Sequence, residues 1–226
     1  MNGRKGIIIA IDGPAGAGKS STAKRVAEAL GYLYLDSGAM YRAVTLEVMR
    51  RGLPLTDERA LIETADACSI GFERRNNQQR VLLNDQDVTD VIRTPEVTGS
   101  IAPVAANASV RAILVRKQQA LGETGGLVAE GRDIGTVVFP KAELKIFMIA
   151  SLQERAKRRA AEMAERGIVV ELSQLAEDIR RRDESDRVRD HGALKQADDA
   201  VVLDTSNLTL DQQVERIIAL AKERGA

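Results

Sequence analysis

Short apolar runs alternate with longer stretches of helical periodicity along most of this chain. Apolar runs of strand length indicate buried β-strands, and the stretches between them carry helix stop signals such as Gly31 and Gly52. This alternation is typical of a parallel sheet with helices on its faces, so we predict an α/β fold with a five-stranded parallel sheet. The expected strands are Ile7–Asp12, Leu33–Asp36, Leu127–Glu130, Leu144–Ile149 and Val201–Asp204. The expected helices are Lys19–Leu30, Ala39–Arg51, Asp57–Ala67, Ala108–Leu121, Leu152–Arg166, Leu172–Arg182 or slightly beyond, and a last helix from the capping box Thr209 and Gln212 to about Lys222.

One region interrupts this alternation, from Ser69 to about Pro103. It contains two short extended pieces, Ile70–Glu73 and Arg80–Leu83, around the polar turn Arg74–Gln79. A loop rich in Asp, Thr, Val and Pro is expected to follow them. We therefore predict a core domain formed by residues 1–62 and 103–226, with a small hairpin insert at residues 63–102.

A glycine-rich segment follows the first apolar run directly and matches the pattern G-x-x-x-x-G-K-S/T. In this pattern the glycines let backbone N–H groups surround phosphates, the lysine places a charge near the β- and γ-phosphates, and the hydroxyl can ligate Mg²⁺. A Rossmann dinucleotide motif does not fit, because its third glycine is missing. The sequence therefore predicts a nucleoside triphosphate site. Its expected residues are Gly13, Pro14, Ala15, Gly16, Ala17, Gly18, Lys19, Ser20 and Ser21.

Composition limits the possible partners and compartments. The chain has 226 residues, 44% of them hydrophobic, and its 33 basic residues balance its 33 acidic ones. The chain therefore has no net positive charge that would attract nucleic acid or an anionic membrane. Cys68 is the sole cysteine, which excludes an intrachain disulfide, and the apolar run before Asp12 is too short for a signal peptide. We expect a soluble, cytoplasmic protein that binds neither nucleic acid nor membrane.

Arginine-bearing segments follow two of the expected strands, at the edge where open α/β sheets bind ligands. They are Asp36–Arg42 and Glu130–Gly135, and a further charged cluster spans Arg180–Arg189. One interpretation of this cluster is a solvated helix with pairs such as Arg182–Asp186 and Asp183–Arg187. The other is that some of these arginines close over phosphates during phosphoryl transfer, which needs several negative charges neutralised.

Several long motifs resemble those of bacterial cytidylate kinases, a family of P-loop nucleoside monophosphate kinases. They are IDGPAGAGKSS at 11–21, YLDSGAMYRA at 34–43, GRDIGTVVFP at 131–140, RRDESDRVR at 181–189 and ADDAVVLDTSNLTLDQ at 197–212. The resemblance covers nearly the whole chain, including the hairpin insert. It implies Mg²⁺-dependent phosphoryl transfer from ATP to CMP or dCMP, giving CDP or dCDP, by a monomer that acts on small molecules.

The resemblance also implies roles for individual residues. Helices from about residue 37 would belong to the monophosphate-binding region, and residues 157–172 would form a helical lid in which Arg158 contacts ATP and Arg159 and Arg166 are further candidates. The lysine and arginines expected to be catalytic are Lys19, Arg132, Arg182 and Arg189. The residues expected to hold the acceptor are Ser37, Tyr41, Arg42, Ser100, Arg111, Arg132, Asp133, Arg182, Asp186 and Arg189.

Within the acceptor set, the resemblance assigns phosphate contacts to Arg42, Arg132 and Arg189. It assigns the cytosine to Ser100, Arg111 and Asp133, and the pentose to Arg182 and Asp186 together with Ser100. A carboxylate suits the exocyclic amine of cytosine, and arginine suits its N3 and O2 acceptors. Ser20 is expected to ligate Mg²⁺ directly and Asp36 through water.

Some residues also have structural interpretations. Ser37 could cap the next helix, and Asp133 could simply pair with an arginine. Two other functions remain open: a P-loop kinase for another acceptor, such as a different monophosphate, shikimate or a sugar, and a nucleotide-controlled switch. A hydroxyl acceptor needs a general base, and no obvious one occurs, since His191 is expected at the surface. The N-K-x-D segment typical of guanine-reading switches is also absent.

Overall fold

The computed structural model describes residues 6–75, 78–165, 167–188 and 192–226. The chain forms two compact units, one comprising Met1–Tyr34 and Gly122–Ala226, the other Leu35–Leu121. The first is called the sheet unit and the second the helical unit.

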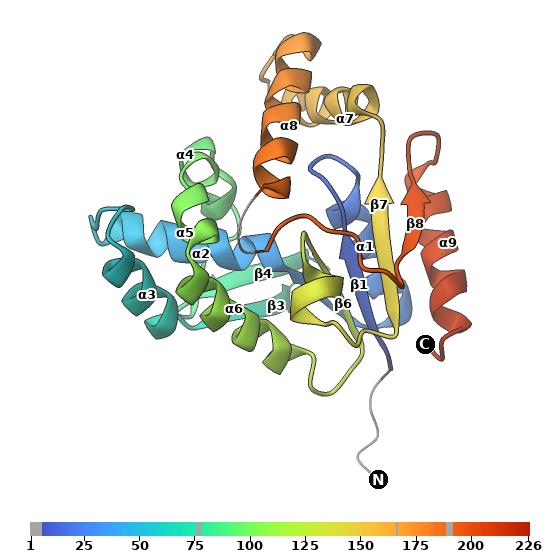
Figure 1. Cartoon of the computed structure of the whole chain (residues 1–226), viewed down its shortest axis with the longest axis horizontal. Coiled ribbons are helices and arrows are strands. Elements are labelled where there is room, and N and C mark those ends of the chain that lie inside the picture. Colours follow the sequence, from blue (N-terminus) through green and yellow to red (C-terminus); the bar gives the residue numbers. More distant parts are fainter. Residues whose placement is uncertain (1–5, 76–77, 166, 189–191) are drawn as a thin grey trace. The chain divides into compact units, whose positions relative to one another are not determined.

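A five-stranded sheet in the order β2-β6-β1-β7-β8 organises the sheet unit (Figure 1). The strands of this sheet are β1 Ile8–Asp12, β2 Leu33–Asp36, β6 Leu127–Gly131, β7 Leu144–Ile149 and β8 Val201–Asp204. The last two residues of β2, Leu35 and Asp36, belong to the helical unit. The pairs β1–β6, β1–β7 and β7–β8 are parallel, and every residue of β1 and β6 is buried, as expected for a sheet covered on both faces. The predicted fold class and strands are confirmed to within a residue at each end.

The helices of the sheet unit are α1 Lys19–Leu30, the short η2 Ile134–Val138, α7 Leu152–Ala164, α8 Leu172–Arg187 and α9 Leu210–Lys222. Helices α7 and α8 pack on each other in a small cluster of their own. Apolar side chains of α1 and α9 share one buried cluster with those of β1, β7 and β8. The caps agree with the sequence: Gly31 ends α1 in the left-handed region, and Thr209 and Gln212 form the predicted capping box of α9. Helix α8 continues beyond Arg182, as expected, and ends at Arg187.

The helical unit contains six helices of the described residues and a separate three-stranded antiparallel sheet. Its elements are α2 Ser37–Arg50, α3 Glu58–Ala67, β3 Ile70–Arg75, β4 Gln78–Leu83, β5 Gln86–Asp87, η1 Val91–Arg93, α4 Pro95–Gly99, α5 Ala102–Ala106 and α6 Ala108–Leu121. Its core gathers apolar side chains of α2, the hairpin and η1 around the buried thiol of Cys68. Burial raises the pKa of this thiol to about 11.

Three details of the helical unit differ from the sequence predictions. The strands β3 and β4 extend into the expected turn, where Arg75 pairs with Gln78. The expected loop after the hairpin contains η1, α4 and α5, and Thr94 caps α4 ahead of Pro95. The cap of α2 is Asp36, whose Oδ1 accepts a hydrogen bond from the Ala39 N–H at 2.9 Å, and not Ser37, which is the first helical residue.

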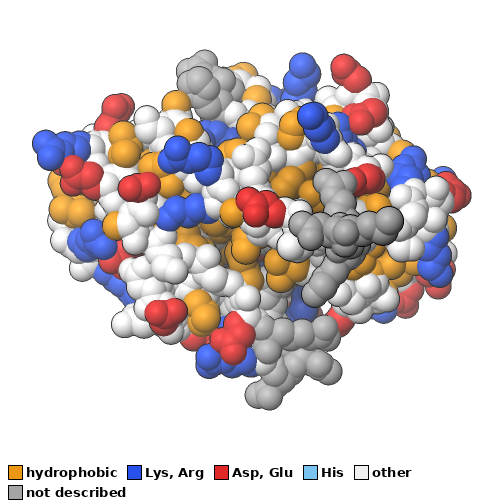
Figure 2. Space-filling model, turned by 90° about the horizontal axis from the view of Figure 1, so that it is seen from below, with side chains coloured by type: hydrophobic (Ala, Val, Ile, Leu, Met, Phe, Trp, Pro, Cys, Tyr) orange, Lys and Arg blue, Asp and Glu red, His pale blue; other side chains and the backbone are white. Residues whose placement is uncertain are grey.

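Acidic and basic side chains are interspersed over the face drawn in Figure 2, in agreement with the balanced composition. Among the helices that the structure describes, none has both the length and the apolar character that crossing a membrane requires.

Candidate active site

The glycine-rich segment connects the end of β1 to the start of α1, so the predicted strand–loop–helix arrangement is confirmed. Its first glycine is required by close packing. Gly13 has a φ of +150°, and a Cβ built on it would lie 2.1 Å from the carbonyl oxygen of Met148. No side chain fits there, which explains why the loop begins with glycine. The loop N–H groups and the N-terminus of α1 together form the type of site that binds phosphate anions.

Lys19, the first residue of α1, is 5% exposed and donates from Nζ to the carbonyl oxygen of Pro14 at 2.8 Å. Burial lowers the pKa of Lys19 to about 7, and the positive charges of Arg132 and Arg182 contribute in the same direction. The opposing charges of Glu130 and Asp12 only partly offset this effect. Arg132 and Arg182, both predicted to be catalytic, therefore lie within electrostatic reach of Lys19.

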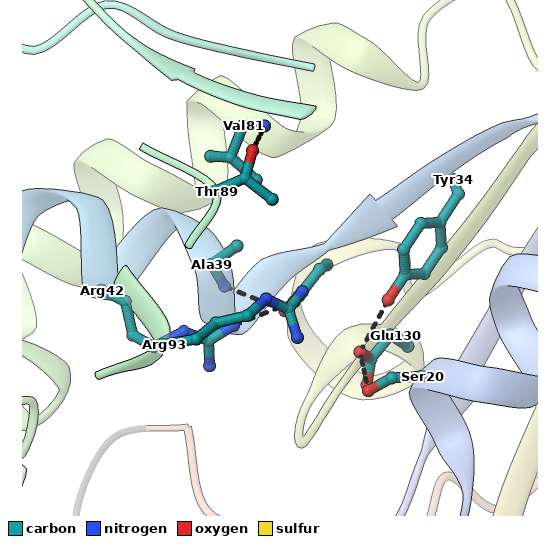
Figure 3. A network of polar contacts seen from close by, with 9 residues as sticks. Ser20, Tyr34, Ala39, Arg42, Val81, Thr89, Arg93 and Glu130 are labelled. Carbon is teal, nitrogen blue, oxygen red and sulfur yellow. Dashed lines mark hydrogen bonds and ion pairs between the residues drawn. The ribbon is translucent and has the colours of Figure 1, made fainter. Parts of the chain in front are cut away.

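Glu130, at the end of β6, was not predicted as a site residue. Its Oε1 accepts hydrogen bonds from the Ser20 hydroxyl at 2.6 Å and the Tyr34 hydroxyl at 3.1 Å (Figure 3). Oxygen donors of this kind suit Mg²⁺, which usually takes one or two protein groups together with phosphates and water. Within the part of the chain that the structure describes, no group of three or more His, Cys, Asp or Glu residues could hold a metal by itself. The Ser20 hydroxyl and the Glu130 carboxylate are of the chemical type that could ligate a magnesium ion.

Asp12, the last residue of β1, positions the segment that follows β6. Its carboxylate accepts hydrogen bonds from the N–H groups of Ile134 at 2.8 Å and Gly135 at 2.7 Å. Burial raises the pKa of Asp12 to about 6, although these two hydrogen bonds act to lower it. Because Arg132 and Asp133 immediately precede the anchored residues, Asp12 fixes the backbone from which both predicted site residues project. Sequence reasoning did not assign it this role.

The loop after β6 also contacts α8. Arg132 donates from Nε to Asp186 Oδ2 at 2.7 Å, so the structure brings these two predicted site residues together. On the same helix Asp183 accepts from Arg155 of α7 at 2.6 Å. The interpretation of α8 as a solvated helix holds for the exposed pairs of Arg180 with Glu177 and Arg181 with Asp178. The buried carboxylates of Asp183 and Asp186 lie instead among arginines from other elements.

Arg158 of α7, predicted to bind ATP, contacts both the phosphate loop and the turn after β8. It donates from Nη1 to the carbonyl oxygen of Ala17 at 3.3 Å, and from Nη2 to that of Thr205 at 2.6 Å. The Thr205 hydroxyl also donates to Ala17 at 3.0 Å. Arg158 therefore lies beside the loop, and its contact with ATP stays a prediction.

In the helical unit a second cluster of charge surrounds Asp36. Its Oδ2 accepts from Arg42 at 2.9 Å and from Arg93 at 3.3 Å, while Oδ1 caps α2 (Figure 3). Arg93 was not predicted as a site residue. Since both carboxylate oxygens already have partners, the predicted contact of Asp36 with Mg²⁺ through water would have to compete with them. Two guanidinium groups on one carboxylate leave a net positive charge, which favours binding of an anion.

Two other predicted acceptor residues meet in the helical unit. The guanidinium of Arg111 lies 5.5 Å from the centre of the Tyr41 ring, within the range of a cation–π contact, and both side chains are buried. Ser37 is buried in the first turn of α2, and Ser100 is the cap residue at the end of α4. Arg189, Arg166 and His191 lie outside the described residues.

A phosphate loop on a buried parallel strand, with a buried lysine flanked by arginines, defines a P-loop phosphotransferase. The sequence profile described as cytidylate kinase matches residues 9–223, so this chain belongs to the cytidylate kinase family. It is 49% identical over 216 residues to proteins of Bacillus cereus and Bacillus anthracis that are named cytidylate kinase, with 96% of each chain covered. The crystal structure of TT1252 from Thermus thermophilus is similar in fold, with a TM-score of 0.51, 20% identity and 98% of each chain covered.

Proposed function

We propose that this chain transfers the γ-phosphoryl group of ATP to CMP or dCMP. The observation that carries the proposal is the buried Lys19 in its phosphate loop, with the charges of Arg132 and Arg182 close by. Membership of the cytidylate kinase family supports the acceptor. That membership does not support a kinase for shikimate or a sugar, and it does not support a nucleotide-controlled switch.

The proposed mechanism depends on charge and position. Lys19 leaves the Pro14 carbonyl to contact the β- and γ-phosphates, and the loop N–H groups bind their remaining oxygens. Arg132 and Arg182 stabilise the charge that spreads over the transferred group, an effect worth roughly 10³–10⁵ in rate for such arginines. The acceptor phosphate is already ionised, so no general base is needed.

Mg²⁺ would be held by the Ser20 hydroxyl, beside the Glu130 carboxylate, and would neutralise charge on the β- and γ-phosphates. Asp36 remains our candidate for a contact with the ion through water. We propose that the acceptor phosphate binds Arg42, Arg132 and Arg189, and that Ser100, Arg111 and Asp133 recognise cytosine. Arg182 and Asp186 then bind the pentose. Uracil would present an acceptor where cytosine presents its amine, which leaves buried polar groups mismatched.

A coupled assay of ADP release with CMP, dCMP, UMP, AMP and shikimate tests this function. We expect CMP and dCMP to be preferred over the other acceptors by roughly 10²-fold or more in kcat/KM. Arg132→Lys keeps the charge but loses the forked geometry, and should reduce kcat/KM for CMP by at least about tenfold. Arg181→Lys, on the exposed side of α8, is the matched control. Faster turnover of shikimate than of CMP would refute the proposal.

We further propose that the enzyme is a cytoplasmic monomer that acts on small molecules without nucleic acid or membrane partners. The balanced charge and the lone cysteine support this view. Sedimentation equilibrium at micromolar concentration tests it, and a dimer mass would contradict it.

A further inference from the structure

Helices α7 and α8 form a hairpin with a small core of its own within the sheet unit. Ala156, Leu175 and Ile179 are its buried apolar residues, and only a few partly buried side chains pack against them. Because this core is small, the polar contacts between the hairpin and the rest of the unit have a large share in fixing its position.

Arg155 makes the most buried of these contacts. It is 7% exposed and donates from Nε to the carbonyl oxygen of Ala150 at 3.1 Å. Its Nη1 donates to two acceptors, Asp183 Oδ2 on α8 at 2.6 Å and the carbonyl oxygen of Ala15 at 3.1 Å. A single guanidinium thus connects the second helix of the hairpin to the middle of the phosphate loop.

The loop also packs directly on the backbone of Arg155. Gly16 has a φ of +76°, and a Cβ built on it would lie 3.1 Å from the Arg155 Cβ and 3.4 Å from the Arg155 carbonyl oxygen. The position of the loop at Gly16 is therefore set by α7 as well as by its own sequence.

The peptide between Ala15 and Gly16 explains how this contact reaches the nucleotide. In a trans peptide the carbonyl oxygen and the following N–H point in opposite directions. Because Arg155 holds the Ala15 oxygen, it orients the Gly16 N–H to the other side, as a phosphate-binding loop requires. A phosphate that accepts from this N–H polarises the peptide and strengthens the Ala15 oxygen as an acceptor for Arg155.

At its other end the contact reaches residues of the acceptor site. Asp183 and Asp186 are three residues apart, so they share one face of α8, and both are buried. Asp186 contacts Arg132, and the charge of Arg182, next to Asp183, acts on Lys19. Asp183 thus holds the turn of α8 that carries two residues assigned to the acceptor pentose.

We propose that Arg155 and Asp183 are positioning residues that couple the two nucleotide sites, so that a nucleotide in the phosphate loop strengthens binding of the acceptor monophosphate. When phosphate binding strengthens the hydrogen bond from Arg155 to the Ala15 oxygen, the change reaches Asp183 through the same guanidinium. Asp183 then affects Arg182 and Asp186, which lie on the same part of α8. The proposal rests on the proposed function for the identity of the acceptor. Coupling of this kind typically changes affinity by about 5- to 150-fold.

The competing explanation is that the ion pair only joins α7 to α8. The two explanations differ for a variant in which both partners become apolar, Arg155→Met with Asp183→Leu. Replacing both members of a buried ion pair with apolar groups leaves no unpaired charge and often preserves stability. This double variant keeps the hairpin joined but has no donor for the Ala15 oxygen. Asp183→Asn is the single variant, and Asp178→Asn on the exposed side of α8 is the matched control.

The experiment measures the Kd of CMP by calorimetry with and without a saturating non-hydrolysable ATP analogue, adenylyl imidodiphosphate. For the wild type and Asp178→Asn we expect the analogue to lower this Kd by at least about fivefold. For the double variant and Asp183→Asn we expect a change below about twofold, with thermal unfolding of the double variant close to that of the wild type. Wild-type coupling in the stable double variant would overturn the proposal.

Hydrogen exchange gives a second readout that does not depend on CMP. The analogue alone should slow exchange of the α8 amides in the wild type and in Asp178→Asn, but not in the double variant. If the wild type binds no CMP while this protection follows the expected pattern, the proposed function fails and the coupling stands. If the analogue protects α8 equally in all variants, or in none, the coupling is wrong.

Discussion

Binding of a nucleoside diphosphate or triphosphate should be accompanied by uptake of a proton by Lys19. Burial and the nearby arginines lower the pKa of this lysine to about 7, from 10.5 for a free side chain. At pH 8 such a lysine is protonated in about one molecule in ten. Bound phosphates favour the charged form and raise the pKa again, so binding at pH 8 should take up about 0.9 proton.

The sign of the pH dependence follows from the same shift. Above pH 7 the free enzyme must first protonate Lys19, so affinity should weaken by nearly tenfold, or about 1.4 kcal/mol, for each unit of pH. Well below pH 7 the lysine is already charged and uptake by this group should vanish. At pH 7 itself we expect uptake of about half a proton.

Calorimetric titration with ADP and Mg²⁺ in buffers of different ionisation enthalpy measures this uptake. At pH 8 the terminal phosphate is ionised, since its second pKa is about 6, so the ligand contributes little. The slope of binding enthalpy against buffer ionisation enthalpy gives the number of protons.

Lys19→Arg is the matched control, because a guanidinium stays charged at every accessible pH and should take up no proton at pH 8. A wild-type uptake below about 0.2 proton at pH 8, or an uptake in the arginine variant equal to the wild type, would refute the reasoning. The second result would assign the proton to another group.

Three further predictions concern single substitutions. Glu130→Gln should raise the Mg²⁺ concentration for half-maximal activity by about 10-fold or more, because a neutral amide orients Ser20 and metal-bound water less well. An unchanged magnesium dependence would contradict the placement of Glu130 beside the magnesium site. Gly13→Ala should lower the unfolding free energy measured in urea by about 3 kcal/mol or more, since its Cβ would meet the Met148 carbonyl. The control Gly31→Ala, whose Cβ would meet nothing within 4 Å, should lower it by only about 1 kcal/mol. Equal losses in the two variants would contradict the packing argument. Asp133→Asn should reduce kcat/KM for CMP more than for UMP, and parallel losses would remove Asp133 from cytosine recognition.

The sheet and the phosphate loop could be predicted from the sequence because their signals are local. Buried strands such as Leu144–Ile149 are continuous apolar runs, and the loop has a fixed spacing between Gly13 and Lys19. The helices α4 and α5 were missed because a five-residue helix is too short to show helical periodicity, and its Thr and Pro residues also occur in loops.

Residues that position others were harder to predict than residues that match a motif. Asp12 acts on backbone N–H groups 122 residues away, and Arg155 on a carboxylate 28 residues away. Neither distance follows from a periodic pattern. Glu130 begins the arginine-bearing segment Glu130–Gly135, but its contact with the Ser20 hydroxyl depends on the parallel pairing of β1 and β6. Such contacts become visible only when strands and helices are placed in three dimensions.

The burial of Cys68 makes this protein convenient to label. With a pKa of about 11, only about one molecule in 10⁴ carries a thiolate at pH 7, so reagents that attack thiolates should leave this residue intact. A cysteine introduced at an exposed position, such as Val169 in the sheet unit, would then react alone. One further cysteine in the helical unit would give a pair of fluorescent labels whose energy transfer reports the distance between the two units as ATP and CMP bind.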